Sequence, residues 1–106
     1  IKYFIPKNKK LARWSSLFIP QCDIFHAIHQ DCPYLPSKKA KYILTIHDFN
    51  ALYENSNEIK KKTFIKNLQQ KVDRAEVVTF ISEFTKVEAL KYLKLKKMEY
   101  LFYLFP

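Results

Sequence analysis

The sequence predicts an α/β fold built on a parallel sheet of about four strands with crossover helices. From residue 42 onward the chain alternates strand, helix, strand, helix and strand, an order typical of parallel strands joined by right-handed crossovers. The strand stretches are nearly continuous in apolar residues, as in parallel strands covered on both faces. The 106 residues are 48% hydrophobic, which suits one domain with a buried core. We therefore expect residues 1–106 to form a single partial domain.

The first third of the chain contains two short strands and one short helix. The apolar stretch 1–6 predicts a strand. A helix is expected at 9–18, where apolar residues recur at helical spacing, and Pro20 ends it. These apolar positions are Leu11, Trp14, Leu17 and Phe18. A brief strand at 23–27 follows, and the stretch 30–41, rich in proline and lysine, predicts a loop.

The middle of the chain contains the clearest strand and the longest helix. Residues 42–46 are almost all apolar and predict a buried parallel strand. Residues 58–75 predict an amphipathic helix with one apolar stripe and basic residues elsewhere. The stripe consists of Ile59, Phe64, Ile65, Leu68 and Val72. The basic positions are Lys60, Lys61, Lys62, Lys66, Lys71 and Arg74.

The last third repeats the order of strand, helix and strand. A β-branched run at 77–81 predicts the next strand. Ser82 is a natural N-cap for a helix that extends to about residue 93. The inner stripe of that helix is expected to be Phe84, Val87 and Leu90. A final strand is expected at 99–104.

The absence of glycine and the presence of two cysteines both bear on the class of protein. The chain has no glycine, although a complete nucleotide-binding α/β domain normally needs glycine in its phosphate-binding loop. Such a loop is therefore expected outside this stretch, or the protein has none. Cys22 and Cys32 form no disulfide framework or zinc spacing, so we read them as reduced thiols of a cytoplasmic protein.

The formal net charge of +9 bears on the partners of the chain. A charge of this size attracts polyanions such as nucleic acid, anionic lipid headgroups and sugar phosphates. A solvated basic surface with no specific partner explains it equally well. Because no apolar run reaches the roughly 20 residues that cross a bilayer, membrane contact is expected only at a surface.

Polar residues follow three of the predicted strands. One strand ends at His26, one at His47-Asp48 and one at Ser82-Glu83. Because ligands of open parallel sheets bind beyond the carboxyl ends of the strands, these residues are candidates for one site. His47 is the foremost functional candidate, and His26 is weaker. Asp48 is expected mainly to hold a turn and Ser82 to cap a helix, although a capped helix start also binds phosphate or sugar hydroxyls.

Metal binding is not favoured by the spacing of the candidate ligands. His26 and His29 together with Cys22 and Cys32 match no standard zinc finger or ribbon. His29 is the weakest functional candidate among the histidines, because it lies in a predicted loop.

Several stretches together resemble glycosyltransferase family four. They are 23–26, the sequence YILTIHD at 42–48, the basic helix, and the sequence AEVVTFISEFTK at 75–86. Members of that family are retaining, nucleotide-sugar-dependent enzymes of the GT-B fold. The likeness extends from about residue 15 to the end and implies a partial Rossmann-like domain, the second half of an acceptor-binding N-terminal domain. The family's glycine-rich loop would precede Ile1 and its donor-binding domain would follow Pro106, so the fragment alone is expected to be inactive.

The resemblance also implies roles for individual residues. His47 matches the family histidine that contacts the transferring sugar or the acceptor, and Asp48 matches its structural neighbour. Ser82 matches the helix-capping serine at the edge of the cleft. Family members transfer hexoses, often mannose, to lipid-linked or polysaccharide acceptors, and some dock on anionic membranes. Lys60, Lys61, Lys62 and Lys66 would suit such docking. No cofactor is expected in this chain, because the missing domain would hold most of the nucleotide sugar.

Two other interpretations stay open. A small basic module that binds nucleic acid would suit the charge, but such modules usually expose aromatic rings among their basic residues. In the basic helix the one aromatic residue, Phe64, lies on the predicted buried stripe, which favours the enzyme. The other possibility is a fragment that keeps a fold without a function.

Overall fold

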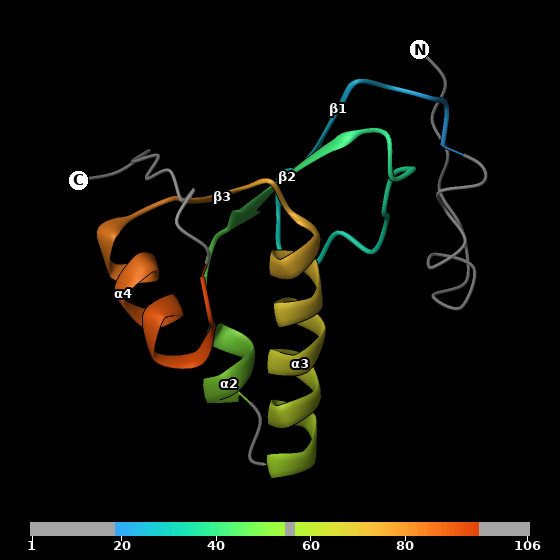
Figure 1. Cartoon of the computed structure of the whole chain (residues 1–106). Coiled ribbons are helices and arrows are strands. Elements are labelled where there is room, and N and C mark those ends of the chain that lie inside the picture. Colours follow the sequence, from blue (N-terminus) through green and yellow to red (C-terminus); the bar gives the residue numbers. More distant parts are fainter. Residues whose placement is uncertain (1–18, 55–56, 96–106) are drawn as a thin grey trace.

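Three parallel strands form a sheet in the part of the chain that the structure describes. They are β1 (Ile24–Ala27), β2 (Lys41–Ile46) and β3 (Val77–Phe80), in the spatial order β1-β2-β3 (Figure 1). The computed structural model describes residues 19–54 and 57–95, so the strands expected at 1–6 and 99–104 and the helix expected at 9–18 lie outside it. The parallel pairing of β2 with β3 confirms the α/β prediction at the level of a small domain with a parallel sheet.

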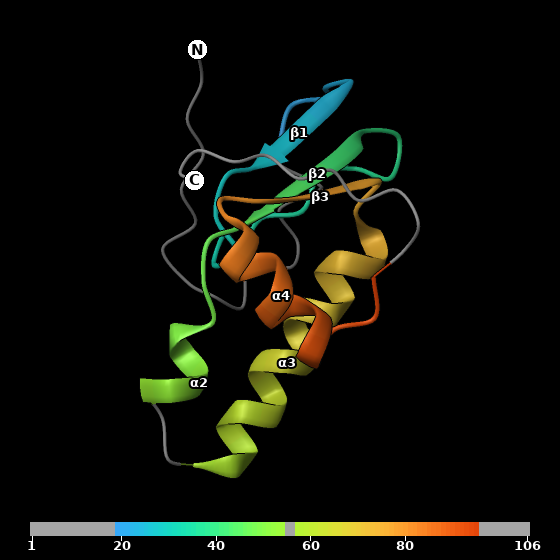
Figure 2. The same ribbon diagram turned by 90° about the vertical axis from the view of Figure 1, so that its left-hand side faces the viewer.

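The core lies on one face of this sheet. Tyr42, Leu44 and Ile46 of β2 are fully buried, whereas the alternate residues Ile43 and Thr45 are only half-buried. Within the described part of the chain all helices lie on the same side of the sheet (Figure 2). Among the described residues no helix covers the face that carries Ile43 and Thr45, which we call the open side of the sheet. The expectation that both faces are covered stays a prediction.

Two helices of the described residues begin and end close to where the sequence predicts. Helix α3 (Glu58–Arg74) is capped by Asn57, whose side-chain oxygen accepts from the backbone N–H groups of Ile59 (2.9 Å) and Lys60 (3.3 Å). Helix α4 (Glu83–Tyr92) is capped by Ser82, as expected. Such caps satisfy backbone donors that have no partner within the helix.

A third helix, α2 (Asn50–Glu54), was not expected from the sequence. Its five residues are too few to show an apolar period. Asp48 starts it, because its Oδ1 accepts from the backbone N–H of Asn50 at 3.1 Å. Leu52 then anchors the helix in the core.

The inner face of α4 differs from the prediction. Phe84, Val87 and Leu90 are 73%, 46% and 57% exposed, so the predicted apolar inner stripe is wrong. The face turned inward instead carries Thr85, Glu88 and Ala89. Polar contacts fix this orientation: the Thr85 hydroxyl donates to the His47 carbonyl at 2.9 Å, and Glu88 accepts from the Tyr53 hydroxyl.

The apolar stripe of α3 is buried only in its second half. Leu68 and Val72 lie in the core and Phe64 and Ile65 pack against it, but Ile59 is 76% exposed. The first turns of α3 project beyond the sheet, where no strand lies over them (Figure 1). None of the helices in the described ranges combines the length and the apolar character needed to cross a membrane.

Candidate functional site

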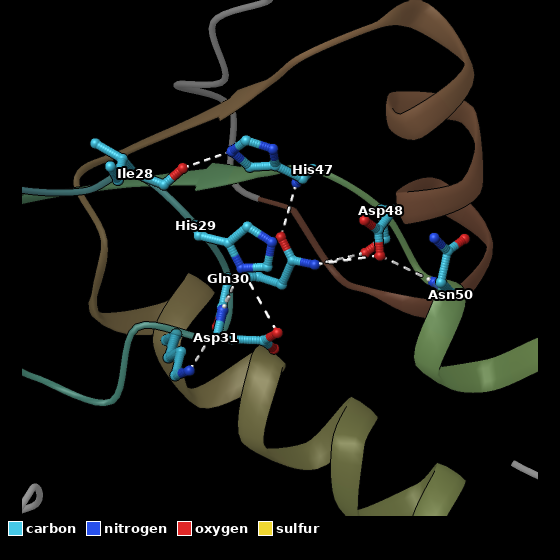
Figure 3. A network of polar contacts seen from close by, with 8 residues as sticks. Ile28, His29, Gln30, Asp31, His47, Asp48 and Asn50 are labelled. Atoms are coloured by element: carbon cyan, nitrogen blue, oxygen red, sulfur yellow. Dashed lines mark hydrogen bonds and ion pairs between the residues drawn. The ribbon is translucent and has the colours of Figure 1, made fainter. Parts of the chain in front are cut away.

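His47 lies directly after β2, at the carboxyl edge of the sheet (Figure 3). Its Nε2 is 2.6 Å from the backbone carbonyl oxygen of Ile28. A carbonyl oxygen only accepts, so this Nε2 carries the proton and donates. In the neutral ring Nδ1 is then left as an acceptor. The ring is thereby fixed between β1 and β2, with one nitrogen available to a ligand.

Gln30 holds the chain on which His47 sits. Its side chain is buried, with 4% exposure, and its Oε1 accepts from the backbone N–H of His47 at 2.8 Å. Its Nε2 donates to the backbone carbonyl of Asp48 at 3.1 Å and lies 3.4 Å from the Asp48 carboxylate (Figure 3). The Gln30 amide thus pairs with the backbone N–H of His47 and with the backbone carbonyl of Asp48, which holds the peptide between these two candidate residues in place. No pattern in the sequence indicates this role, since Gln30 lies in a stretch expected to be a loop.

Lys71 of α3 holds the loop that carries Gln30. Its ammonium donates to the Gln30 carbonyl at 2.6 Å. Burial lowers the pKa of Lys71 from its ordinary value, while the nearby Cys32 and Asp31 act in the opposite direction. A partly buried charge of this kind is retained where its hydrogen bonds are made. The loop after β1 is therefore anchored to the helix layer.

His29, the weakest candidate from the sequence, lies against His47. The two ring centroids are 4.6 Å apart and the rings are inclined by 33°. The Nδ1 of His29 accepts from the backbone N–H of Asp31 at 3.1 Å, and this contact orients the ring. The sequence ranks His29 lowest because it lies in a predicted loop, and the structure places its ring beside His47 in a loop that Lys71 anchors.

Asp48 and Ser82 act on the backbone. Asp48 holds the turn into α2, as expected. The Ser82 hydroxyl oxygen accepts from the Thr85 N–H at 3.2 Å. Because the Thr85 hydroxyl donates to the His47 carbonyl, Ser82 is the donor in the 3.0 Å contact between the two hydroxyl groups. Ser82 is therefore connected to His47 through Thr85.

His26 faces the open side of the sheet, one residue before the end of β1. Its Nε2 is 2.7 Å from the Thr45 hydroxyl, which is 2.7 Å from the Thr79 hydroxyl. These three side chains form a hydrogen-bonded row across β1, β2 and β3. Threonines at paired positions of parallel strands face the same side, which explains the row.

A cavity of about 330 Å³ brings His26 and His47 together. The two threonines of the row also line it, and its remaining wall is apolar, made by Ile28, Phe80 and Ile81. Asp48 and Ser82 do not line this cavity. Of the four site residues expected from the sequence, two therefore face the cavity and two support the backbone beside it.

The basic residues of α3 lie apart from this cavity, and none of them lines it. Lys60, Lys62 and Lys66 are exposed, as expected. Lys61 differs, since it is half-buried and its ammonium lies 3.5 Å from the Glu58 carboxylate. Within 19–54 and 57–95, no cluster of three or more histidine, cysteine, aspartate or glutamate side chains is suited to a metal ion.

Comparisons of the chain with protein-family models, with curated proteins and with solved structures gave no match. The fold and the geometry of the site therefore stand as the evidence on function.

Proposed function

We propose that this chain is part of a retaining glycosyltransferase of family four, which moves a hexose from a nucleotide sugar to a glycan or lipid-linked acceptor. The chain would be the second half of an N-terminal acceptor domain of GT-B type, with a Rossmann-like sheet. The observation that carries the proposal is His47: it follows the central strand, lines a cavity at the carboxyl edge of the sheet and is held there by Ile28 and Gln30. The sequence resemblance adds to this argument.

In this proposal His47 is the catalytic residue and contacts the reacting sugar. With Nε2 bound to Ile28, its Nδ1 accepts a hydrogen bond from a sugar hydroxyl. His26 offers a second polar contact in the same cavity. The volume, about 330 Å³, lies at the lower end of the range of small-ligand sites, about 300–1,000 Å³. A single sugar ring, mannose being our first choice, suits such a site.

Asp48 and Ser82 position the catalytic histidine in this proposal. Asp48 fixes the turn that follows His47, and Ser82 acts on the His47 carbonyl through Thr85. The nucleotide of the donor would be bound mainly by a C-terminal domain of the longer protein. The exposed lysines of α3 would attract the protein to the anionic inner face of the membrane from the cytoplasm.

The test is made on the full-length gene product. Radiolabelled GDP-mannose and other nucleotide sugars are supplied with a lipid extract and a glycan extract as acceptors. His47→Ala should lower transfer about 100-fold or more, because one contact to the reacting centre is commonly worth that much. Its melting temperature should stay near that of the wild type.

Asp48→Ala separates a positioning role from a catalytic one. It should lower the free energy of unfolding by about 0.5–2 kcal/mol together with activity, because it removes the group that starts α2.

Normal turnover of the His47 variant would refute the role of His47. Absence of transfer by the wild type with every donor would refute the proposed function itself.

A further inference from the structure

A second cavity of the described residues lies away from His47. It has a volume of about 760 Å³ and opens between α2, α3 and the end of α4. Figure 1 shows these three elements grouped below the sheet. The cavity shares no lining residue with the one at His47. Its function is therefore a separate question from that of the sheet edge.

Two polar clamps give this cavity a fixed shape. Gln69 of α3 accepts from the backbone N–H of Lys94 at 2.8 Å and donates to the carbonyl of the same residue at 2.9 Å. On the other side the Tyr53 hydroxyl of α2 donates to the buried Glu88 carboxylate of α4. Side-chain hydrogen bonds thus tie α2 to α4, and α3 to the segment that follows α4, which favours a preformed site.

The floor of the cavity is apolar and partly aromatic. Leu52 and Ile65 contribute aliphatic groups, and Tyr53 and Tyr92 contribute rings. Tyr53 is 66% exposed and Tyr92 is 39% exposed, so much of this surface still faces solvent. Apolar surface left exposed in a hollow gains free energy when an apolar ligand covers it.

The rim of the cavity is positively charged. The carboxylate of Glu58 is the acidic group of the lining, and Lys61 already pairs with it at 3.5 Å. The ammonium groups of Lys62, Lys66 and Lys94 make no ion pair within the described ranges. Lys62 and Lys66 are four residues apart on α3 and so lie on the same side of the helix. The rim therefore carries uncompensated positive charge above an apolar floor.

We infer that this cavity binds an anionic amphiphile, with an alkyl or acyl chain on the apolar floor and a phosphate or carboxylate head at the rim lysines. Free phosphate would make no use of the floor, and a neutral lipid would make no use of the rim. The inference deepens the proposed membrane contact of α3, because a cavity selects single molecules whereas a charged surface attracts a bilayer as a whole. It concerns residues distinct from those proposed for sugar transfer.

The first experiment measures binding of alkyl phosphates to the whole chain by isothermal titration calorimetry, below the concentration at which they form micelles. Decyl phosphate should bind with a stoichiometry of one. Affinity should rise from octyl to decyl phosphate by about two- to fourfold for each added methylene, as expected for burial of apolar surface. Inorganic phosphate and decyl maltoside should bind at least about tenfold more weakly, because phosphate lacks the alkyl chain and decyl maltoside lacks the anionic head.

The second experiment uses a matched set of lysine variants. Lys62→Ala and Lys66→Ala should each weaken binding of decyl phosphate by about fivefold, the effect of one basic residue near an anionic group. Lys60→Ala is the control, because Lys60 is an exposed residue of the same helix that does not line the cavity. It should bind as the wild type does. All three side chains are exposed, so the variants should fold, which circular dichroism checks.

Three outcomes would overturn the inference. One is equal weakening by all three lysine variants, which indicates attraction to the general charge of α3. Another is binding of inorganic phosphate as tight as that of decyl phosphate. The last is a single-stranded oligonucleotide that displaces decyl phosphate and binds more tightly, which would favour a nucleic-acid surface with Tyr53 and Tyr92 as stacking rings. A His47→Ala variant should keep normal binding of decyl phosphate, so failure of sugar transfer and failure of this inference are distinguishable.

Discussion

Two buried polar residues near the sheet differ in how well their hydrogen-bonding groups are satisfied. Gln30 uses both ends of its amide on the backbone of His47 and Asp48. The hydroxyl of Tyr42 is buried and has no partner among the described residues. Burial raises the pKa of Tyr42 to about 12; Cys32 acts in the same direction, and Arg74 over its ring acts against it. Buried polar groups are costly unless paired, so the Gln30 amide contributes to stability whereas the Tyr42 hydroxyl reduces what the buried Tyr42 ring contributes.

Replacement of Gln30 should therefore have a large effect for a loop residue. Gln30→Ala should lower the free energy of unfolding by about 1–3 kcal/mol, because a backbone N–H and a carbonyl lose a buried partner. Gln70→Ala, at an exposed position of α3, is the control and should change it by less than about 0.5 kcal/mol. Urea unfolding monitored by circular dichroism gives both values. Equal values for the two variants would contradict the bridging role of Gln30.

At the scale of elements, the sequence predicts the strands that have a clear apolar run and the helices that have an apolar pattern over several turns or a strong N-cap. The strands β1, β2 and β3 and the helices α3 and α4 lie within one or two residues of their expected bounds. Helix α2 escaped prediction because five residues show no period. The inner face of α4 escaped because contacts from distant residues set it: Thr85 reaches the His47 carbonyl and Glu88 reaches Tyr53. Apolar spacing contains no information on such long-range polar contacts.

The capping role of Ser82 can be tested by two substitutions at the same position. Ser82→Ala should lower the free energy of unfolding by about 0.5–2 kcal/mol, because the N–H of Thr85 loses its acceptor. Ser82→Asp should retain most of the stability, since its carboxylate also accepts at a helix start and suits the helix dipole. Thermal and urea unfolding of both variants measure this. An equal loss in both would show that Ser82 acts through some other contact than the cap.

At the scale of the whole molecule, side chains from different elements make the candidate site and the cavity. The sequence predicts that His26, His47 and Ser82 lie on one edge, because it predicts parallel strands. It does not predict the contacts that Gln30 and His29 make with His47. It also does not predict the hydrogen-bonded row of His26, Thr45 and Thr79. These contacts depend on which loops and strands lie next to each other in the fold. The contact between Tyr53 and Glu88 joins α2 to α4 and has the same origin.

This contact between helices should make stability depend on pH in two ranges. The hydrogen bond from Tyr53, with the ammonium of Lys91, lowers the pKa of Glu88 from its ordinary value of 4.5. The same bond raises the pKa of Tyr53 from its ordinary value of 10.0. A lowered acid pKa contributes stability above 4.5 that is lost as the pH falls through the folded value, and a raised phenol pKa contributes stability below 10.0 that is lost as the pH rises.

The variant Glu88→Gln isolates this dependence. The difference in the free energy of unfolding between the wild type and the variant should be greatest near neutral pH and shrink below pH 4.5. Glu76→Gln, at an exposed position just before β3, is the control. Urea unfolding at pH 3 to 8 gives the curves. A difference that stays constant over this range would contradict the assigned role of Glu88.

The parallel arrangement of the sheet also bears on the order in which the molecule folds. Parallel strands cannot be joined by a tight hairpin, so every ladder bond of β2 joins segments that are distant in the chain. The entropy of closing these loops is lost before the ladder forms, whereas α3 has its own cap and forms from local contacts. We therefore expect the helices to form before the sheet during folding. Until both neighbours arrive, the apolar residues of β2 are exposed, which makes this strand an aggregation-prone segment of the nascent protein.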